Sequence, residues 1–179
     1  MKKKRILALF LAAVSCLSLA VSASAANTTA RKAADFRDFD KSAWYADAVS
    51  AAVDNGLLYG KSSTIIDPNG DMTRAEMAAI INRSFGCYAK ADISKYNDVS
   101  KDKWYFEDVA MAVQMGTYNG RSNTAMAPDA PITRQEAMTV VARALELDYD
   151  SYSKTDLSTF SDRSEISNWA LPYVRAMVG

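Results

Sequence analysis

The chain has 179 residues, in which 21 basic side chains balance 21 acidic ones, and it contains no histidine. Histidine is the commonest general base and metal ligand, so its absence argues against an enzyme. We therefore expect no catalytic residues, no metal site and no cofactor. The charge balance also lacks the basic excess typical of nucleic-acid-binding proteins, which predicts no nucleic-acid partner.

The first 25 residues have the order of a signal peptide. Lys2–Arg5 are basic, residues 6–19 are mostly apolar, and Ala23-Ser24-Ala25 is a small-x-small cleavage site. The apolar run is too short for a membrane span, which needs about 20 residues. We therefore predict export, cleavage after Ala25 and no membrane span.

Removal of that segment changes both the charge and the cysteine count. It carries four of the 21 basic residues and no acidic ones, so 17 basic residues remain against 21 acidic ones. Any bound anion must then be held by local groups, because bulk charge does not attract it. Cys87 is the one cysteine left, which excludes an internal disulfide. Residues 26–34 are small and polar and predict a flexible linker.

An internal repeat dominates the rest of the chain. Residues 36–86 match residues 96–146 without a gap at 16 of 51 positions, an offset of 60 residues. We assign repeat 1 to residues 35–90 and repeat 2 to residues 91–150. Residues 157–179 are the start of a third copy, which we expect to be truncated before its loop and second helix.

Each repeat has the pattern helix, loop, helix, which predicts an all-α fold. The expected helices are 43–55, 73–86, 103–115, 133–146 and 168–178. The first helices should begin at the N-caps Ser42, Asp102 and Ser167 and end at Gly56 and Gly116.

The second helices begin with a capping box. Thr73 and Glu76 have the required spacing, and so have Thr133 and Glu136. We expect a buried stripe after the first box, made of Met77, Ile80, Ile81 and Phe85. Two such helices cannot bury their apolar faces alone, so neighbouring repeats must pack together.

Four ordered motifs resemble the S-layer homology (SLH) family. Each repeat opens with aromatic-x-Asp (Phe36 to Asp38, Tyr96 to Asp98, Phe160 to Asp162), followed by a tryptophan six or seven residues later. Gly-x-x-x-Gly then follows in the first two repeats, and after it a proline before Thr-Arg-x-Glu. The resemblance implies that repeats come in threes and pack as a pseudo-threefold helical prism with the second helices at its centre.

The resemblance also implies a function. SLH repeats bind secondary cell-wall polysaccharide, often carrying a pyruvate ketal, in grooves between repeats. We expect a non-covalent cell-wall anchor at the cell surface. The alternatives are an S-layer self-assembly or protein-interaction module, with other S-layer subunits as partners, and a tether between outer membrane and peptidoglycan.

The candidate polysaccharide-binding residues recur in both repeats. Arg74 and Arg134 are suited to bidentate binding of a carboxylate beside a helix N-terminus. The alternative is an interior ion pair with Asp38, Asp98 or a neighbouring glutamate. Trp44, Trp104 and Trp169 are interpreted as core residues or as sugar-stacking platforms.

Further candidates follow the second loop glycine. They are interpreted as groove donors or as solvated surface: Lys61, Ser62, Arg121 and Ser122. Arg83 and Arg143, late in the second helices, are explained by the helix dipole alone.

Overall fold

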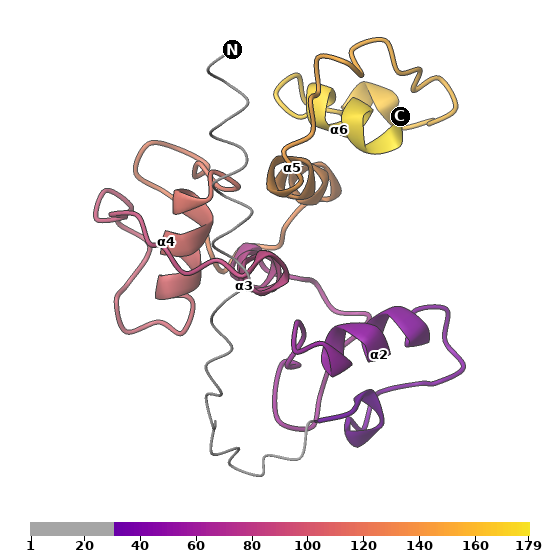
Figure 1. Cartoon of the computed structure of the whole chain (residues 1–179), viewed down its shortest axis with the longest axis vertical. Coiled ribbons are helices and arrows are strands. Elements are labelled where there is room, and N and C mark those ends of the chain that lie inside the picture. The colour runs from indigo at the N-terminus through magenta and orange to yellow at the C-terminus, as the bar shows by residue number, and fades with distance from the viewer. Residues whose placement is uncertain (1–30) are drawn as a thin grey trace, which may run out of the picture. The chain divides into compact units, whose positions relative to one another are not determined.

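The computed structural model describes residues 31–179, so the predicted signal peptide and linker residues 26–30 lie outside it. These residues form five α-helices, two short 3-10 helices and no strand, which confirms the all-α prediction (Figure 1). The elements are η1 (Ala33–Asp35), α2 (Ala46–Asp54), α3 (Arg74–Phe85), α4 (Phe106–Gln114), α5 (Arg134–Ala144), η2 (Arg163–Glu165) and α6 (Leu171–Val178).

The first helix of each repeat begins three residues later than predicted. Ser42 is not the N-cap of α2, because its N–H and hydroxyl both donate to Asp40 Oδ1, at 2.8 and 2.6 Å. This local bonding closes a turn and competes with the helix, as short polar side chains commonly do. The N-cap of α2 is Tyr45. In repeat 2 the N-cap of α4 is Tyr105 and not the predicted Asp102. Ser167 lies in a turn before α6, whose N-cap is Ala170.

The first helices of repeats 1 and 2 are terminated by the predicted glycines. Gly56 has φ +67°, and its N–H donates to Val53 O at 3.0 Å. The next N–H, of Leu57, reaches back to Ala52 O at 2.8 Å, which completes a Schellman motif. Gly116 ends α4 in the same way.

The aromatic-x-Asp motif folds the loop of each repeat. In repeat 2 the Asp98 carboxylate accepts N–H groups from Met126 at 2.9 Å and Ala127 at 2.7 Å. Gly120 has φ +80°, and a Cβ there would come within 2.7 Å of the Tyr96 ring. In repeat 1 the Asp38 carboxylate accepts the N–H groups of Ile66 and Asp67 in the same way. A Cβ at Gly60 would likewise meet the Phe36 ring.

Both capping boxes are present as predicted. Thr73 Oγ1 accepts from the Glu76 N–H at 3.2 Å, and Glu76 Oε2 accepts from the Thr73 N–H at 2.8 Å. Thr133 and Glu136 repeat this arrangement at the start of α5. These bonds satisfy N–H groups that a helix N-terminus otherwise leaves unpaired.

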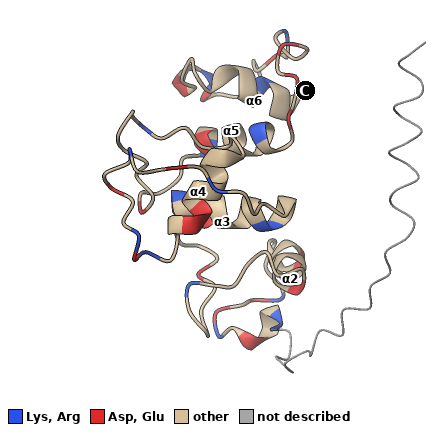
Figure 2. Ribbon diagram, turned by 60° about the vertical axis from the view of Figure 1, so that its left-hand side comes forward, with Lys and Arg blue, Asp and Glu red and all other residues tan. Residues whose placement is uncertain are grey.

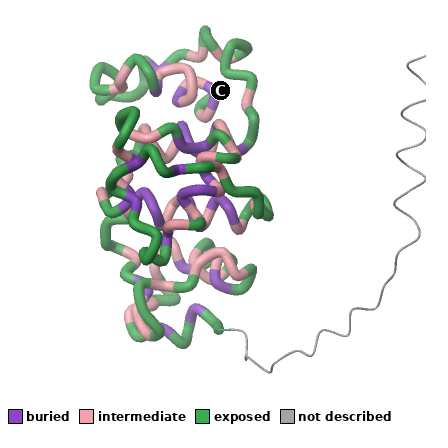
Figure 3. The backbone as a smooth tube through the Cα atoms, turned by 90° about the vertical axis from the view of Figure 1, so that its left-hand side faces the viewer, coloured by how far each residue is buried: buried purple, intermediate pink, exposed green. Residues whose placement is uncertain are grey.

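Neighbouring repeats pack through their helices, as expected. α3 of repeat 1 packs against α4 of repeat 2 and also contacts α5, and α5 packs against α6 (Figure 1). Buried residues concentrate where these elements meet (Figure 3). The largest core cluster accordingly combines repeat 1 residues such as Ile81 with Tyr105, Val109 and Val140 of repeat 2.

The predicted stripe on α3 is partly wrong. Ile81 is buried, but Phe85 is 43% exposed, and the buried face consists mainly of Ala75, Ala78 and Ala79. Small side chains let neighbouring helices approach closely, so alanines fill much of the buried face that larger residues were expected to occupy.

Candidate functional site

Two grooves open on the described part of the chain. The first groove has a volume of about 510 Å³ and the second about 350 Å³. Both are built from the same five positions: the second loop glycine, the cation after it, the capping-box glutamate, a late arginine of the second helix, and a tryptophan of the next repeat. In the first groove these are Gly60, Lys61, Glu76, Arg83 and Trp104. In the second they are Gly120, Arg121, Glu136, Arg143 and Trp169.

The two grooves differ in one part of their lining. In repeat 2 the side chains of Tyr118, Met126 and Pro128 are in contact with the start of α3. The corresponding residues of repeat 1 line the first groove, namely Leu58, Ile66 and Pro68.

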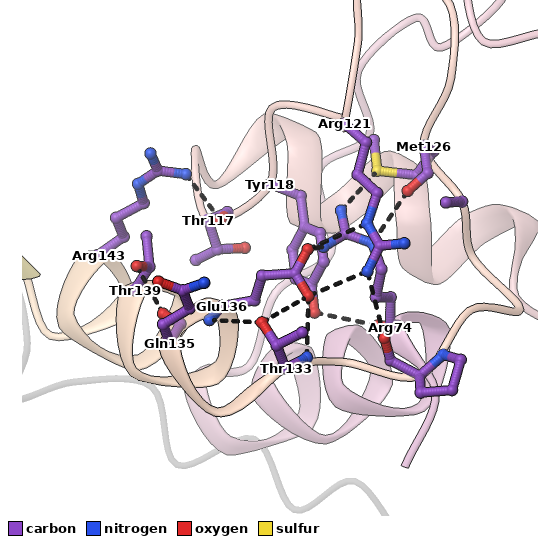
Figure 4. Close-up of polar contacts among 12 residues, drawn as sticks. Arg74, Thr117, Tyr118, Arg121, Met126, Thr133, Gln135, Glu136, Thr139 and Arg143 are labelled. Carbon is purple, nitrogen blue, oxygen red and sulfur yellow. Dashed lines mark hydrogen bonds and ion pairs between the residues drawn. The ribbon is translucent and has the colours of Figure 1, made fainter. Parts of the chain in front are cut away.

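Arg74 lies at the inner end of the second groove and is only 5% exposed (Figure 4). Its Nε donates to Met126 O at 3.0 Å, and its Nη1 donates to Glu136 Oε1 at 2.8 Å. The guanidinium also lies 5.0 Å from the centre of the Tyr118 ring. This is the interior ion pair with a neighbouring glutamate that was the alternative to a ligand contact.

The N-terminus of α3 is also occupied. The N–H of Arg74 donates to Ala130 O at 3.0 Å, and the N–H of Ala75 donates to Pro128 O at 2.9 Å. Both acceptors belong to the loop of repeat 2, so these donors hold the repeats together and do not face a ligand. Arg134, the first residue of α5, is exposed and lies outside both grooves.

Glu136 is the electrostatic centre of the second groove (Figure 4). Burial alone would raise the pKa of its carboxyl, but hydrogen bonds from Arg121 and Thr133 and the charge of Arg74 outweigh burial and lower it. Burial lowers the pKa of Arg74, and the nearby Glu136 carboxylate opposes that shift. The pair is therefore ionised at neutral pH.

The remaining candidates separate into two groups. Trp44 and Trp104 are 94% and 60% exposed and both line the first groove, so the core interpretation of these residues is wrong. Asp38 and Asp98 bind loop N–H groups and lie outside both grooves.

Ser62 and Ser122 also act within their loops. Their Oγ atoms accept from the Thr64 N–H at 3.2 Å and the Thr124 N–H at 3.3 Å. Neither serine lines a groove.

Sequence reasoning missed several groove residues. Arg143 lines the second groove, its Nη1 donates to Thr117 O at 3.3 Å, and its guanidinium lies 4.9 Å from the Tyr173 ring. Asn119 and Thr139 share that groove. Trp169, which the sequence offered as a core residue or a stacking platform, also lines it and is 51% exposed. The recurrence of Arg83 as Arg143 was the available signal, but the helix dipole explained it without a ligand.

Basic and acidic side chains are interspersed over residues 31–179 (Figure 2). Within this range no cluster of three or more metal-ligating side chains occurs. None of the helices found there has the length and apolar character needed to cross a membrane.

The fold and the grooves define a tandem helical-repeat protein with grooves between its repeats. A family profile for the S-layer homology domain matches residues 35–78 and 95–138, within the two predicted repeats. The chain belongs to the S-layer homology family. Domains of this family bind cell-wall components, and this chain is a cell-surface protein.

Several curated proteins are similar to this chain. It is 35% identical over 147 residues to the "Surface-layer 125 kDa protein" of Lysinibacillus sphaericus, covering 82% of this chain and 12% of that protein. It is 27% identical over 170 residues to an "Endoglucanase" of Bacillus sp. (strain KSM-635), covering 93% of this chain and 18% of the enzyme. The "S-layer protein sap" of Bacillus anthracis is 24% identical over 153 residues, or 86% of this chain and 18% of that protein. The chain thus spans less than a fifth of each of these relatives.

Proposed function

We propose that this chain anchors a protein non-covalently to the cell wall by binding secondary cell-wall polysaccharide in its two grooves. One observation carries the proposal: each groove combines an exposed tryptophan with cationic side chains at positions that recur in both repeats. Similarity of this one segment to a surface-layer protein and to an endoglucanase supports an anchoring role that does not depend on the attached protein.

The groove chemistry suits a polysaccharide that carries carboxylates. Exposed indole rings offer an apolar face with a polar edge, which matches the apolar faces of sugar rings. Guanidinium groups bind carboxylates in a bidentate manner, and a pyruvate ketal supplies a carboxylate. We assign stacking to Trp44 and Trp104 and polar contacts to Lys61 and Arg121.

Arg74 has a different place in the proposal. Its donors are used within the protein, and we propose that it positions Glu136, which in turn holds Arg121 at 3.1 Å. Arg134, free of the grooves, is proposed as an accessory contact for a longer glycan.

Co-sedimentation with purified wall sacculi tests this function. The full chain should pellet with sacculi that retain the polysaccharide and stay in solution with sacculi from which it has been removed. Equal binding to stripped sacculi would instead favour a peptidoglycan tether. Sedimentation of the chain without any sacculi would favour self-assembly.

A further inference from the structure

We propose that the two grooves have different ligands: the second groove binds the carboxylate-bearing sugar of the wall glycan, and the first groove excludes it. This inference rests on the proposed function, because it divides the glycan between the two grooves.

The grooves differ in net charge. The second groove is lined by three cations, Arg74, Arg121 and Arg143, and one carboxylate, Glu136, which gives a net charge of +2. The first groove is lined by two cations and three carboxylates, a net charge of −1. Because carboxylate binding depends on the local field inside a cleft, the second groove attracts an anion and the first repels it.

Two substitutions between the repeats contribute to the difference. Asp67 and Asp71 line the first groove, and the corresponding residues of repeat 2 are Ala127 and Pro131. Neither replacement carries a charge. Glu76 and Glu136 are common to both grooves, so they do not distinguish them.

Arg143 has donors left for a ligand. Its Nη1 donates to Thr117 O, while its Nε and Nη2 make no hydrogen bond within residues 31–179. Arg121 has its Nε and Nη2 on Glu136 and Pro131 O, which leaves Nη1. These two guanidinium groups, not that of Arg74, therefore provide the groove's uncommitted N–H donors (Figure 4).

Arg83, the corresponding arginine of the first groove, is held in the same way as Arg143, by one backbone carbonyl and one aromatic ring. The Arg83 guanidinium lies 4.2 Å from the centre of the Tyr59 ring, and its Nη1 donates to Leu57 O at 3.0 Å. In repeat 2 the position of Tyr59 is taken by Asn119, an exposed amide that adds a donor to the groove. The loop of repeat 2 thus replaces a ring with a hydrogen-bonding group.

The tryptophans give each groove its own reporter. Trp169 lines the second groove, and Trp44 and Trp104 line the first. We would follow their indole N–H signals by NMR in the full chain during titration with a methyl hexopyranoside that carries a 4,6-pyruvate ketal. The same glycoside without the ketal is the comparison.

The ketal glycoside should shift the Trp169 signal saturably, at least tenfold more tightly than the ketal-free glycoside. Trp44 and Trp104 should respond less to the ketal glycoside than to the ketal-free glycoside, because the first groove repels the carboxylate. Arg143→Gln should weaken the Trp169 response at least tenfold, and Asn119→Asp, which adds a charge on an exposed loop, should also weaken it. Asp71→Asn, in the first groove, should leave the Trp169 response unchanged.

A ketal-dependent response of Trp104 as tight as that of Trp169 would overturn the inference, and so would the absence of any Trp169 response. Either result leaves the anchoring function intact if the chain still pellets with polysaccharide-bearing sacculi. Loss of that pelleting would instead reject the anchoring function itself.

Discussion

Arg74 links the two repeats through a buried ion pair, and its removal tests that role. The side chains of Arg74 and Glu136 are 6% and 12% exposed. Loss of one partner from a buried pair costs about 3–5 kcal/mol, because the other charge stays buried. Since Arg121 still contacts Glu136, we expect Arg74→Gln to lower the free energy of unfolding by about 3 kcal/mol.

Lys61→Gln is the matched control for that substitution. Lys61 and Glu76 form a pair whose side chains are 31% and 26% exposed, and such pairs contribute about 0–1 kcal/mol. Urea denaturation of both variants makes the comparison. Equal losses would show that Arg74 does not hold the repeats together.

Glu136 makes the stability of this contact depend on pH. Its pKa in the folded chain is lowered, so its contribution is complete above the unfolded pKa of about 4.3. The contribution is lost as the pH falls through the lower, folded value. Denaturation at pH 7, 5, 4 and 3 should show a steep loss below about pH 4 that is smaller in Glu136→Gln. An unchanged acid profile in that variant would exclude this carboxylate as the cause.

At the scale of the elements, the repeat loop depends on a glycine without space for a side chain. Gly120 and Gly116 both have positive φ, at +80° and +79°, so alanine strains either position, by about 1–2 kcal/mol. Only at Gly120 would the new Cβ also meet the Tyr96 ring and two backbone oxygens within 3.0 Å. We expect Gly120→Ala to lower the melting temperature clearly more than Gly116→Ala. Equal shifts in melting temperature would mean that backbone strain alone accounts for the loss of stability.

The second helices were predictable because their signals are local. A capping box is complete within four residues, and α3 and α5 begin immediately after Thr73 and Thr133. The first helices were predicted to begin too early. The Ser42 side chain can either cap a helix or bond to a neighbouring side chain, and sequence alone favoured the cap. Bonding to Asp40 decided otherwise.

The candidate site was predictable only in part. The positions of Lys61 and Arg121 follow from the repeat, and both line grooves. The partner of Arg74 lies 62 residues away, and nothing local indicates that contact. Trp169 joins the second groove only through the packing of α6 on α5, which no sequence spacing reveals.

For residues 31–179 as a whole, the core is divided among three clusters. The largest joins α3, α4 and α5, while α2 and η1 share a smaller one built on Phe36, Val53 and Ile66. A third, around Leu157, Ala170 and Val174, holds α6. Segments with fewer buried contacts open at lower free energy than those in the largest core.

Hydrogen exchange tests this division. Amides of α3 and α4 should exchange most slowly, and those of α2 and α6 should exchange faster, because their clusters are smaller. Uniform protection over all five helices of residues 31–179 would show that the clusters act as one core.

The proposed anchoring function assigns glycan binding to both grooves, and one calorimetric comparison tests it most directly. Purified wall polysaccharide is titrated into the full chain and into a variant in which Trp104→Ala and Trp169→Ala remove one exposed ring from each groove. The account predicts saturable binding by the unchanged chain and at least tenfold weaker binding by the variant, with both chains still helical by circular dichroism. Binding of equal affinity in the two chains, or none in the unchanged chain, would contradict it.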